Sequence, residues 1–171
     1  MSEWETIGAT DEWYTPKYIF DAIGEKFDLD VASPAGGPRH TPADCYMTIL
    51  QDGLKSCWGN NFVFMNPPFG GRNGLVPWMD KFFLHGNGIA LTPDRTSAPW
   101  WQDAAQSCSA ILLTRGKVKF EKPDGSVGKS PSNGITLWAS GDRAKLALCR
   151  ASKNGLGSIW LPLHMTGADD E

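Results

Sequence analysis

One short segment constrains the fold of this chain more than any other. Phe62–Met65 is a continuous apolar run typical of a buried strand, and Asn66-Pro67-Pro68-Phe69-Gly70 follows it directly. Prolines lack a backbone N–H and fix their φ angle, so the pair stops the strand and holds the backbone rigid. Asn66 supplies an amide donor and an acceptor oxygen, and Phe69 supplies a flat apolar ring. The segment therefore predicts a buried strand that ends in a rigid corner carrying polar and aromatic groups.

Further short apolar runs alternate with stretches of helical spacing. The predicted strands are 27–31, 62–65, 88–92, 110–114 and 134–139, and the predicted helices begin near 15–16 and cover 75–84 and 100–105. This alternation predicts an α/β fold with a mixed, mostly parallel sheet between two layers of helices. In such sheets ligands bind beyond the carboxyl ends of the strands. The polar residues at these strand ends are therefore candidates for a site.

The length of 171 residues suits one domain, and we find no linker that would divide it. We predict a single domain over 1–171, flexible ends at 1–10 and 165–171, and a basic hairpin near 115–134. No apolar run approaches the ~20 residues of a membrane span, and the acidic start lacks the apolar core of a signal peptide. The four cysteines form no CxxC pair, so we expect reduced thiols in a cytoplasm and no metal site.

The net charge of −3 hides a strong asymmetry. Residues 1–30 carry eight acids and two bases, whereas residues 115–153 carry nine bases and three acids. Arg115, Lys117, Lys119 and Lys122 alternate with other side chains in a way that predicts one wet strand face leading into the hairpin. Such bases can neutralise DNA phosphates, although an ordinary solvated surface is the alternative interpretation.

The corner at residues 66–69 can hold a planar amine. The Asn66 side-chain oxygen and the Pro67 carbonyl can accept the two N–H groups of an exocyclic amine, Pro68 fixes the backbone, and Phe69 can stack on the heterocycle. Two acceptors near such a nitrogen favour the tetrahedral geometry that frees its lone pair, which stabilises the transition state of methyl transfer. The alternative is that the prolines only terminate a strand and that Phe69 belongs to the core.

Several ordered blocks give the chain a family resemblance from about Asp11 to Ala147. The blocks are residues 12–20, 27–33, 51–54 followed by Trp58, 66–70, 92–96 followed by Trp100 and Trp101, and 115–120. In this order they resemble the phage and prophage N6-adenine DNA methyltransferases. The Asn-Pro-Pro-Phe motif alone is less specific, because protein-glutamine methyltransferases use a similar one.

The resemblance implies a Rossmann-like, three-layer methyltransferase fold with S-adenosylmethionine as methyl donor. Thr15 and Pro16 would then lie against the donor's amino-acid end. Asp30 would face its ammonium or ribose, with Ser33 at the same strand end, and Asp52 would accept from its adenine amine or ribose. Turn or cap roles are the alternatives for both aspartates. The Gly-x-Gly loop usual in methyltransferases is absent after residue 31, where Ala-Ser-Pro follows instead.

Two further candidates follow the strand at 88–92. Arg95 can clamp a phosphate or the donor carboxylate, or form a surface ion pair. Trp100 can line the base pocket, or pack as part of a helix face.

The predicted function is therefore site-specific DNA methylation. S-adenosylmethionine would donate a methyl group to the N6 amine of adenine, flipped out of double-stranded DNA, in the cytoplasm of a bacterial host as part of a phage or restriction-modification system. RNA or protein-glutamine methylation is one alternative. A non-catalytic nucleic-acid-binding or anti-restriction module on the same fold is another, and the oligomeric state stays open.

Overall fold

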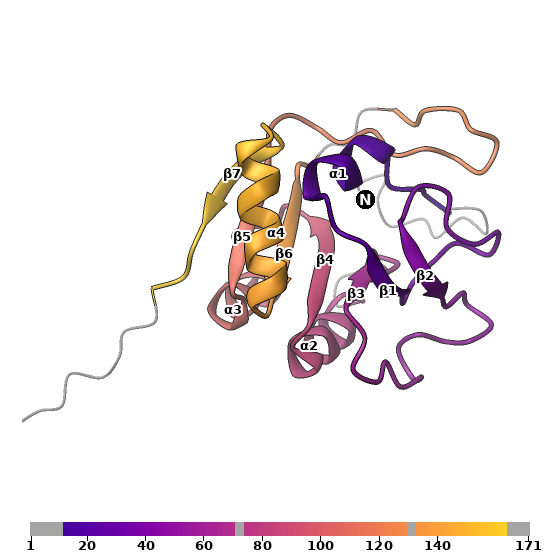
Figure 1. Ribbon diagram of the computed structural model, residues 1–171, viewed down its shortest axis with the longest axis horizontal. Helices are drawn as coiled ribbons and strands as arrows, with labels where there is room; N and C mark the ends of the chain where they lie inside the picture. Colours follow the sequence, from indigo (N-terminus) through magenta and orange to yellow (C-terminus); the bar gives the residue numbers. More distant parts are fainter. Residues whose placement is uncertain (1–11, 71–73, 130–132, 164–171) are drawn as a thin grey trace, which may run out of the picture.

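The computed structural model describes residues 12–70, 74–129 and 133–163, and this part of the chain contains one seven-stranded sheet (Figure 1). The strands lie in the order β2-β1-β3-β4-β6-β5-β7. Their bounds are β1 Phe27–Asp30, β2 Ala43–Tyr46, β3 Val63–Met65, β4 Gly88–Pro93, β5 Ala110–Thr114, β6 Ile135–Ser140 and β7 Gly157–Trp160. The helices are α1 Lys17–Ile23, α2 Val76–His85, α3 Pro99–Ser107 and α4 Asp142–Lys153.

The fold is α/β and its sheet is mixed, as predicted. The sheet is not mostly parallel, however, as the sequence had predicted. The pairings β2–β1, β1–β3 and β3–β4 are parallel, whereas β4–β6, β6–β5 and β5–β7 are antiparallel and longer. The described residues between β5 and β6 contain no helix. The chain therefore returns beside β5 in the opposite direction, since a parallel return would need a crossover.

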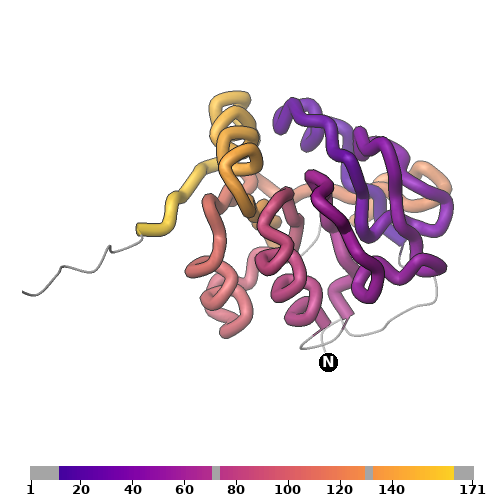
Figure 2. The backbone as a smooth tube through the Cα atoms, turned by 60° about the horizontal axis from the view of Figure 1, so that its bottom comes forward, coloured from indigo at the N-terminus to yellow at the C-terminus, as the bar shows by residue number. Residues whose placement is uncertain are grey.

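Helices cover both faces of the sheet. The core on one face combines α1 and α4 side chains such as Ile19, Phe20 and Leu148 with strand residues. The core on the other face combines α2 and α3 side chains such as Phe82 and Trp101 with the opposite side of the strands. In Figure 2 these two helix pairs lie above and below the sheet. This arrangement leaves the ends of the strands as the place where loops meet.

The predicted strands and helices all form, within two residues of the expected bounds. The sequence analysis did not predict β2, α4 or β7. The ends at 1–10 and 165–171 lie outside the described residues, so their expected flexibility stays a prediction. Within the described part, no helix is long and apolar enough to cross a membrane.

Candidate functional site at the carboxyl ends of the parallel strands

The parallel pairing of β1 with β3 brings two predicted site residues to one cavity. Asp30 is the last residue of β1 and pairs in register with Phe64, so Asn66 lies just beyond the neighbouring strand end. Together with segments 13–15 and 34–41, these residues enclose what we call the strand-end cavity. Its lining residues are Trp13, Tyr14, Thr15, Asp30, Ala32, Pro34, Pro38, His40, Thr41, Phe64 and Asn66.

The Asn66 side chain is oriented by Thr15. Its Nδ2 donates a hydrogen bond of 3.2 Å to the Thr15 hydroxyl oxygen, although the two residues are 51 positions apart. Because the amide nitrogen is engaged there, the amide oxygen is the group left to accept a hydrogen bond from a ligand. The family resemblance implied that Thr15 lies beside the methyl donor, and in the structure Thr15 also holds the Asn66 side chain.

The remainder of the Asn-Pro-Pro-Phe motif forms the expected rigid corner. Pro67 is buried, Pro68 is exposed and Phe69 is half-buried. Phe69 packs against the core under α1 and α4, so the core-packing interpretation holds for part of its ring. Its partial exposure leaves an aromatic face at the end of β3, as stacking on a base requires.

Asp30 is a buried carboxylate, with 3% of its surface exposed. Burial raises its pKa to about 6, against hydrogen bonds from Ala32 and Thr41 that lower it. The Ala32 N–H donates to its Oδ1 over 3.2 Å. The described residues place no cation against this carboxylate. A ligand bearing positive charge would stabilise its ionised form.

Ser33 lies three residues beyond Asp30 and is also buried. Its hydroxyl oxygen has no hydrogen-bond partner in the structure. Buried hydroxyl groups are rarely left unpaired, so a polar ligand group would remove an energetic penalty here. Asp30 lines the strand-end cavity, whereas Ser33 does not. A buried carboxylate in this cavity fits a cationic, polar molecule such as S-adenosylmethionine. Pro16 immediately precedes α1, next to Thr15 on the cavity wall.

Asp52 lies in a tight turn packed against the end of β1. It has a positive φ of 49°, and a Cβ on the following Gly53 would lie 1.9 Å from the Val31 carbonyl oxygen. Lys81 fixes this turn by donating to the carbonyls of Gly53, Leu54 and Ser56. The Asp52 carboxylate itself faces solvent beside Lys55, whose hydrogen bond lowers its pKa. The turn is near the site, but Asp52 does not line the strand-end cavity.

Two other predicted residues are not brought to this cavity. Arg95 is exposed in the turn after β4. Trp100 is partly buried against the core under α2 and α3, as the packing interpretation expects. Its neighbour Trp101 is buried and donates from Nε1 to the Thr136 hydroxyl over 3.1 Å.

The basic segment leaves β5 with one exposed and one buried side, but it does not form the predicted strand. Lys117 and Lys119 are exposed while Val118 between them is buried. Lys122 begins a tight turn in which its N–H donates to the Ser126 carbonyl. We call residues 120–128 the hairpin; Lys122 is its one base, beside the acids Glu121 and Asp124, and residues 130–132 of the longer predicted range lie outside the described part.

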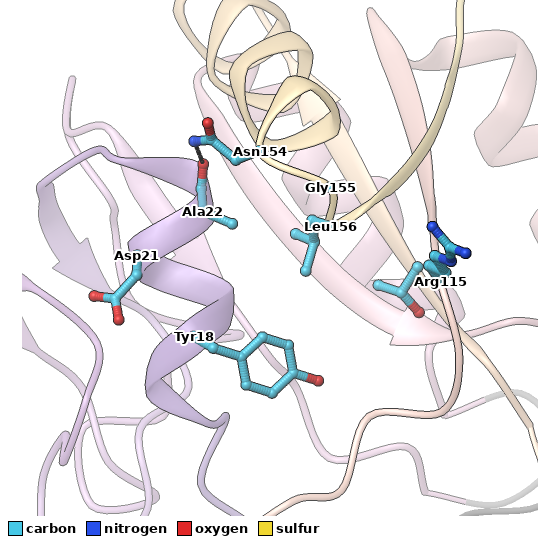
Figure 3. Close-up of a pocket in the computed structure, with 8 residues that line it drawn as sticks. Tyr18, Asp21, Ala22, Arg115, Asn154, Gly155 and Leu156 are labelled. Carbon is cyan, nitrogen blue, oxygen red and sulfur yellow. Dashed lines mark hydrogen bonds between the residues drawn. The ribbon is translucent and has the colours of Figure 1, made fainter.

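Arg115 lies in a separate groove beside this segment. The groove is lined by Tyr18, Asp21 and Ala22 of α1 and by Thr114, Arg115, Asn154, Gly155 and Leu156. Tyr18 points from α1 toward the segment that carries Arg115 (Figure 3). This groove therefore adjoins the start of the basic segment rather than the strand-end cavity.

No cluster of three or more metal-ligating side chains occurs among residues 12–70, 74–129 and 133–163. The loop at 34–41 was not predicted to be part of the site, although it supplies His40 and Thr41 to the cavity wall.

Comparison with known proteins yields one family. The model of the family described as DNA N-6-adenine-methyltransferase (Dam) matches residues 6–138. The matched range includes every residue of the strand-end cavity, and it ends before α4 and β7. No curated protein and no solved structure matches the chain.

Proposed function

Since the chain belongs to the Dam family of DNA N-6-adenine-methyltransferases, we propose that it transfers a methyl group from S-adenosylmethionine to the N6 amine of adenine in double-stranded DNA. The family establishes DNA methylation in general terms. The donor, the flipped adenine and the residue roles below are our proposal. The sheet order, with an antiparallel β6 inserted beside β4, supports a Rossmann-like methyltransferase fold.

The observation that carries this proposal is the bond from Asn66 Nδ2 to Thr15. It turns the Asn66 oxygen into an acceptor of fixed direction next to the Pro67 carbonyl. Two fixed acceptors can take both N–H groups of the adenine amine and favour its tetrahedral, nucleophilic form, which is stabilisation specific to the transition state. Phe69 would stack on the base and Pro68 would keep the corner rigid.

Asp30 and Ser33 are the proposed donor-binding residues. S-adenosylmethionine supplies an activated methyl group on a positively charged sulfur and also carries an ammonium group. The buried Asp30 carboxylate gains a cationic partner when such a molecule binds, and the unpaired Ser33 hydroxyl gains a polar one. Thr15 lines the neighbouring wall, and Pro16 follows it at the start of α1.

The exposed bases Lys117, Lys119 and Lys122 are proposed to contact DNA phosphates, with Arg115 at the start of the same segment. A base in duplex DNA has to leave the stack to reach Asn66. Arg95 and Trp100 are proposed to act on the flanking DNA, since neither lines the cavity. Resemblance to phage and prophage enzymes extends the proposal to such an origin, acting in the host cytoplasm.

The test is incorporation of labelled methyl groups from S-adenosylmethionine into duplex DNA, RNA and protein by the purified chain. We expect incorporation into adenine of DNA, and none into RNA or protein. The Asn66→Ala variant should keep the thermal stability of the wild type and lose incorporation. Labelling of RNA or protein instead of DNA, or near-normal activity of Asn66→Ala, would overturn the proposal.

A further inference from the structure

Three segments that are distant in sequence contact one another, and two of them line the strand-end cavity. They are residues 12–15 before α1, the loop 34–41 between β1 and β2, and the hairpin 120–128 (Figure 1). The first two supply most of the cavity lining, and the third carries or adjoins the lysines assigned to DNA. The contacts between them therefore connect two binding functions.

Arg39 makes the densest of these contacts. Its guanidinium donates to the carbonyl oxygens of Lys122 and Pro123, over 2.9 and 2.7 Å, at the start of the hairpin turn. It also lies 3.4 Å from the Glu121 carboxylate and stacks on the Tyr14 ring at 4.1 Å. One side chain thus binds both the hairpin and the segment that precedes Thr15.

Neighbouring contacts reinforce the same connection. The His40 ring nitrogen lies 3.0 Å from the Glu121 carboxylate, so the residue next to Arg39 binds the hairpin as well. The backbones of Tyr14 and Glu121 exchange two hydrogen bonds of 2.8 and 3.0 Å. A Cβ on Gly128 would lie 2.5 Å from the Trp13 ring, so the returning strand of the hairpin rests directly on the cavity wall.

The cavity behind this wall is small. Its volume is about 10 Å³, which is room for about one water molecule, whereas small-molecule sites enclose roughly 300–1,000 Å³. A nucleoside-sized donor therefore does not fit inside this cavity in the structure described. The inner lining consists of the buried strand residues Asp30 and Phe64. The outer wall consists of residues 13–14 and 34–41, and it is hydrogen-bonded to the hairpin.

We propose that Arg39 is a positioning residue that couples the DNA-contacting hairpin to the outer wall of the donor cavity, so that DNA and donor each change the affinity for the other. This inference rests on the proposed function, since it takes the hairpin as the DNA contact and the cavity as the donor site. Coupling of this kind is reciprocal and typically amounts to 5–150-fold in affinity. When the wall moves on donor binding, the hairpin moves with it. Conversely, a hairpin held on DNA favours one position of the wall and so changes the affinity for the donor.

A matched control exists elsewhere in the chain. Arg143 also stacks on an aromatic ring, that of Phe62 at 4.0 Å, and donates to the Glu25 carboxylate and the Lys26 carbonyl. It lies on α4, outside the cavity lining and the hairpin. Arg143→Ala removes a comparable set of contacts without touching the connection.

The experiment measures the Kd of S-adenosylhomocysteine, the reaction product, by calorimetry with and without a mixed-sequence DNA duplex. For wild type and Arg143→Ala we expect the Kd to change by at least about five-fold when DNA is present. For Arg39→Ala we expect a change below about two-fold. Arg39→Lys should behave like Arg39→Ala in this ratio while keeping the wild-type salt dependence of DNA binding, because it retains the charge but loses the planar fork and the ring stacking.

Amide hydrogen exchange supplies a readout independent of DNA and donor. The N–H groups of Tyr14 and Glu121 should exchange faster in Arg39→Ala than in wild type, and at the wild-type rate in Arg143→Ala. The coupling alone is overturned if Arg39→Ala keeps the wild-type ratio between the Kd values of S-adenosylhomocysteine with and without DNA. It is also overturned if Arg143→Ala loses this ratio to the same extent as Arg39→Ala. A wild type that binds neither S-adenosylhomocysteine nor DNA overturns the proposed function and the coupling with it.

Discussion

The parallel and antiparallel halves of the sheet treat their buried polar groups differently. In the antiparallel half, Thr92 and Thr136 face each other in register, and their hydroxyls accept from the indole N–H groups of Trp138 and Trp101. Among the described residues, the Ser33 hydroxyl just beyond β1 has no partner and the Asp30 carboxylate has no cation beside it. Asp94 Oδ1, just beyond the carboxyl end of β4, is likewise buried without a partner in this part of the chain.

This difference separates a scaffold from a site. Buried polar groups that satisfy each other stabilise a fold, whereas unsatisfied ones reduce stability and persist where a ligand completes them. The direction of the strands explains the division, because parallel strands bring their carboxyl ends to one edge and antiparallel strands do not. Substitutions in the two halves should therefore affect different quantities.

The largest effect on chemistry is expected at Asn66. Asn66→Ala removes one of two acceptors for the reacting amine, and losing one preorganised transition-state contact costs about 10²–10³-fold in kcat. Thermal unfolding should occur at the wild-type temperature, since Asn66 is only partly buried. Single-turnover methyl transfer measures the first quantity and calorimetry the second. If Asn66→Ala lost enough stability to explain its loss of activity, Asn66 would belong to the scaffold rather than to the site.

In the scaffold half the expected effect is on stability alone. Leu148 on α4 is fully buried, and Leu148→Ala should lower the free energy of unfolding by about 2–5 kcal/mol. Urea titration measures this change. The kcat of the folded fraction should equal that of the wild type, and a selective loss of kcat at low temperature would show that the scaffold takes part in the chemistry.

Replacing Asp30 should have the opposite effect to replacing Leu148: the fold should become more stable and donor binding should become weaker. Its pKa of about 6, against an ordinary 3.8, means that the folded state holds the proton more tightly than the unfolded state. Asp30 therefore lowers stability as the pH rises from about 4 to 6, and the full penalty is present above pH 6. Asp30→Asn should raise the free energy of unfolding at pH 7.5 by up to about 2 kcal/mol and by much less at pH 4.

The same titration should govern donor binding. Ionised Asp30 attracts a cation, so the wild-type affinity for S-adenosylmethionine should increase as the pH rises through 6. Asp30→Asn should bind the donor more weakly and without this pH dependence. Calorimetry across that pH range measures the Kd of S-adenosylmethionine for both proteins. If the variant showed the same pH dependence as the wild type, Asp30 would not be part of the donor site.

A smaller effect is expected at Thr15, which orients Asn66 from outside the reacting groups. Thr15→Val keeps the shape of the side chain but removes the oxygen that accepts from Asn66 Nδ2. A hydrogen bond of this kind is worth about 1 kcal/mol, so kcat should fall several-fold. Thr15→Ser should restore it. Equal kcat values for the valine and serine variants would mean that Asn66 is held by other contacts.

The smallest effect per residue is expected on the basic segment. Neutralising Lys117, Lys119 and Lys122 should reduce the salt dependence of DNA binding by up to about 0.9 per lost phosphate contact in a plot of log K against log salt. Lys153→Gln, on the exposed end of α4, is the control and should leave the slope unchanged. Equal slopes for all variants would place the DNA elsewhere.

The sequence predicted the parts of the fold that are strongly apolar. The runs at 62–65 and 110–114 are buried strands, as their composition indicates. The helix α4 was missed because its buried side is made mainly of alanines, at 144, 147 and 151, which give a weak apolar signal. The edge strand β2 was missed because three of its four residues are exposed and no alternation results.

The sequence singled out some residues that the structure brings to one cavity, but not the contacts between them. Asn66 and Asp30 were identified from local patterns, since each stands at the end of an apolar run. The bond between Thr15 and Asn66 joins residues 51 positions apart, and the bonds from Arg39 to the hairpin span more than 80. Local patterns contain no information on such pairings, and Arg39 drew no attention because an isolated arginine in a polar loop is ordinary.

We propose that the chain methylates adenine in DNA with Asn66, at the end of β3, orienting the reacting amine. The most direct test is to produce the chain in a bacterial host free of DNA methylation and to map modified bases by sequencing. We predict N6-methyladenine in the DNA of cells with the wild type or with Arg143→Ala, and none with an equal amount of Asn66→Ala. DNA without N6-methyladenine in the wild-type cells, or the same modification with Asn66→Ala, would contradict the claim.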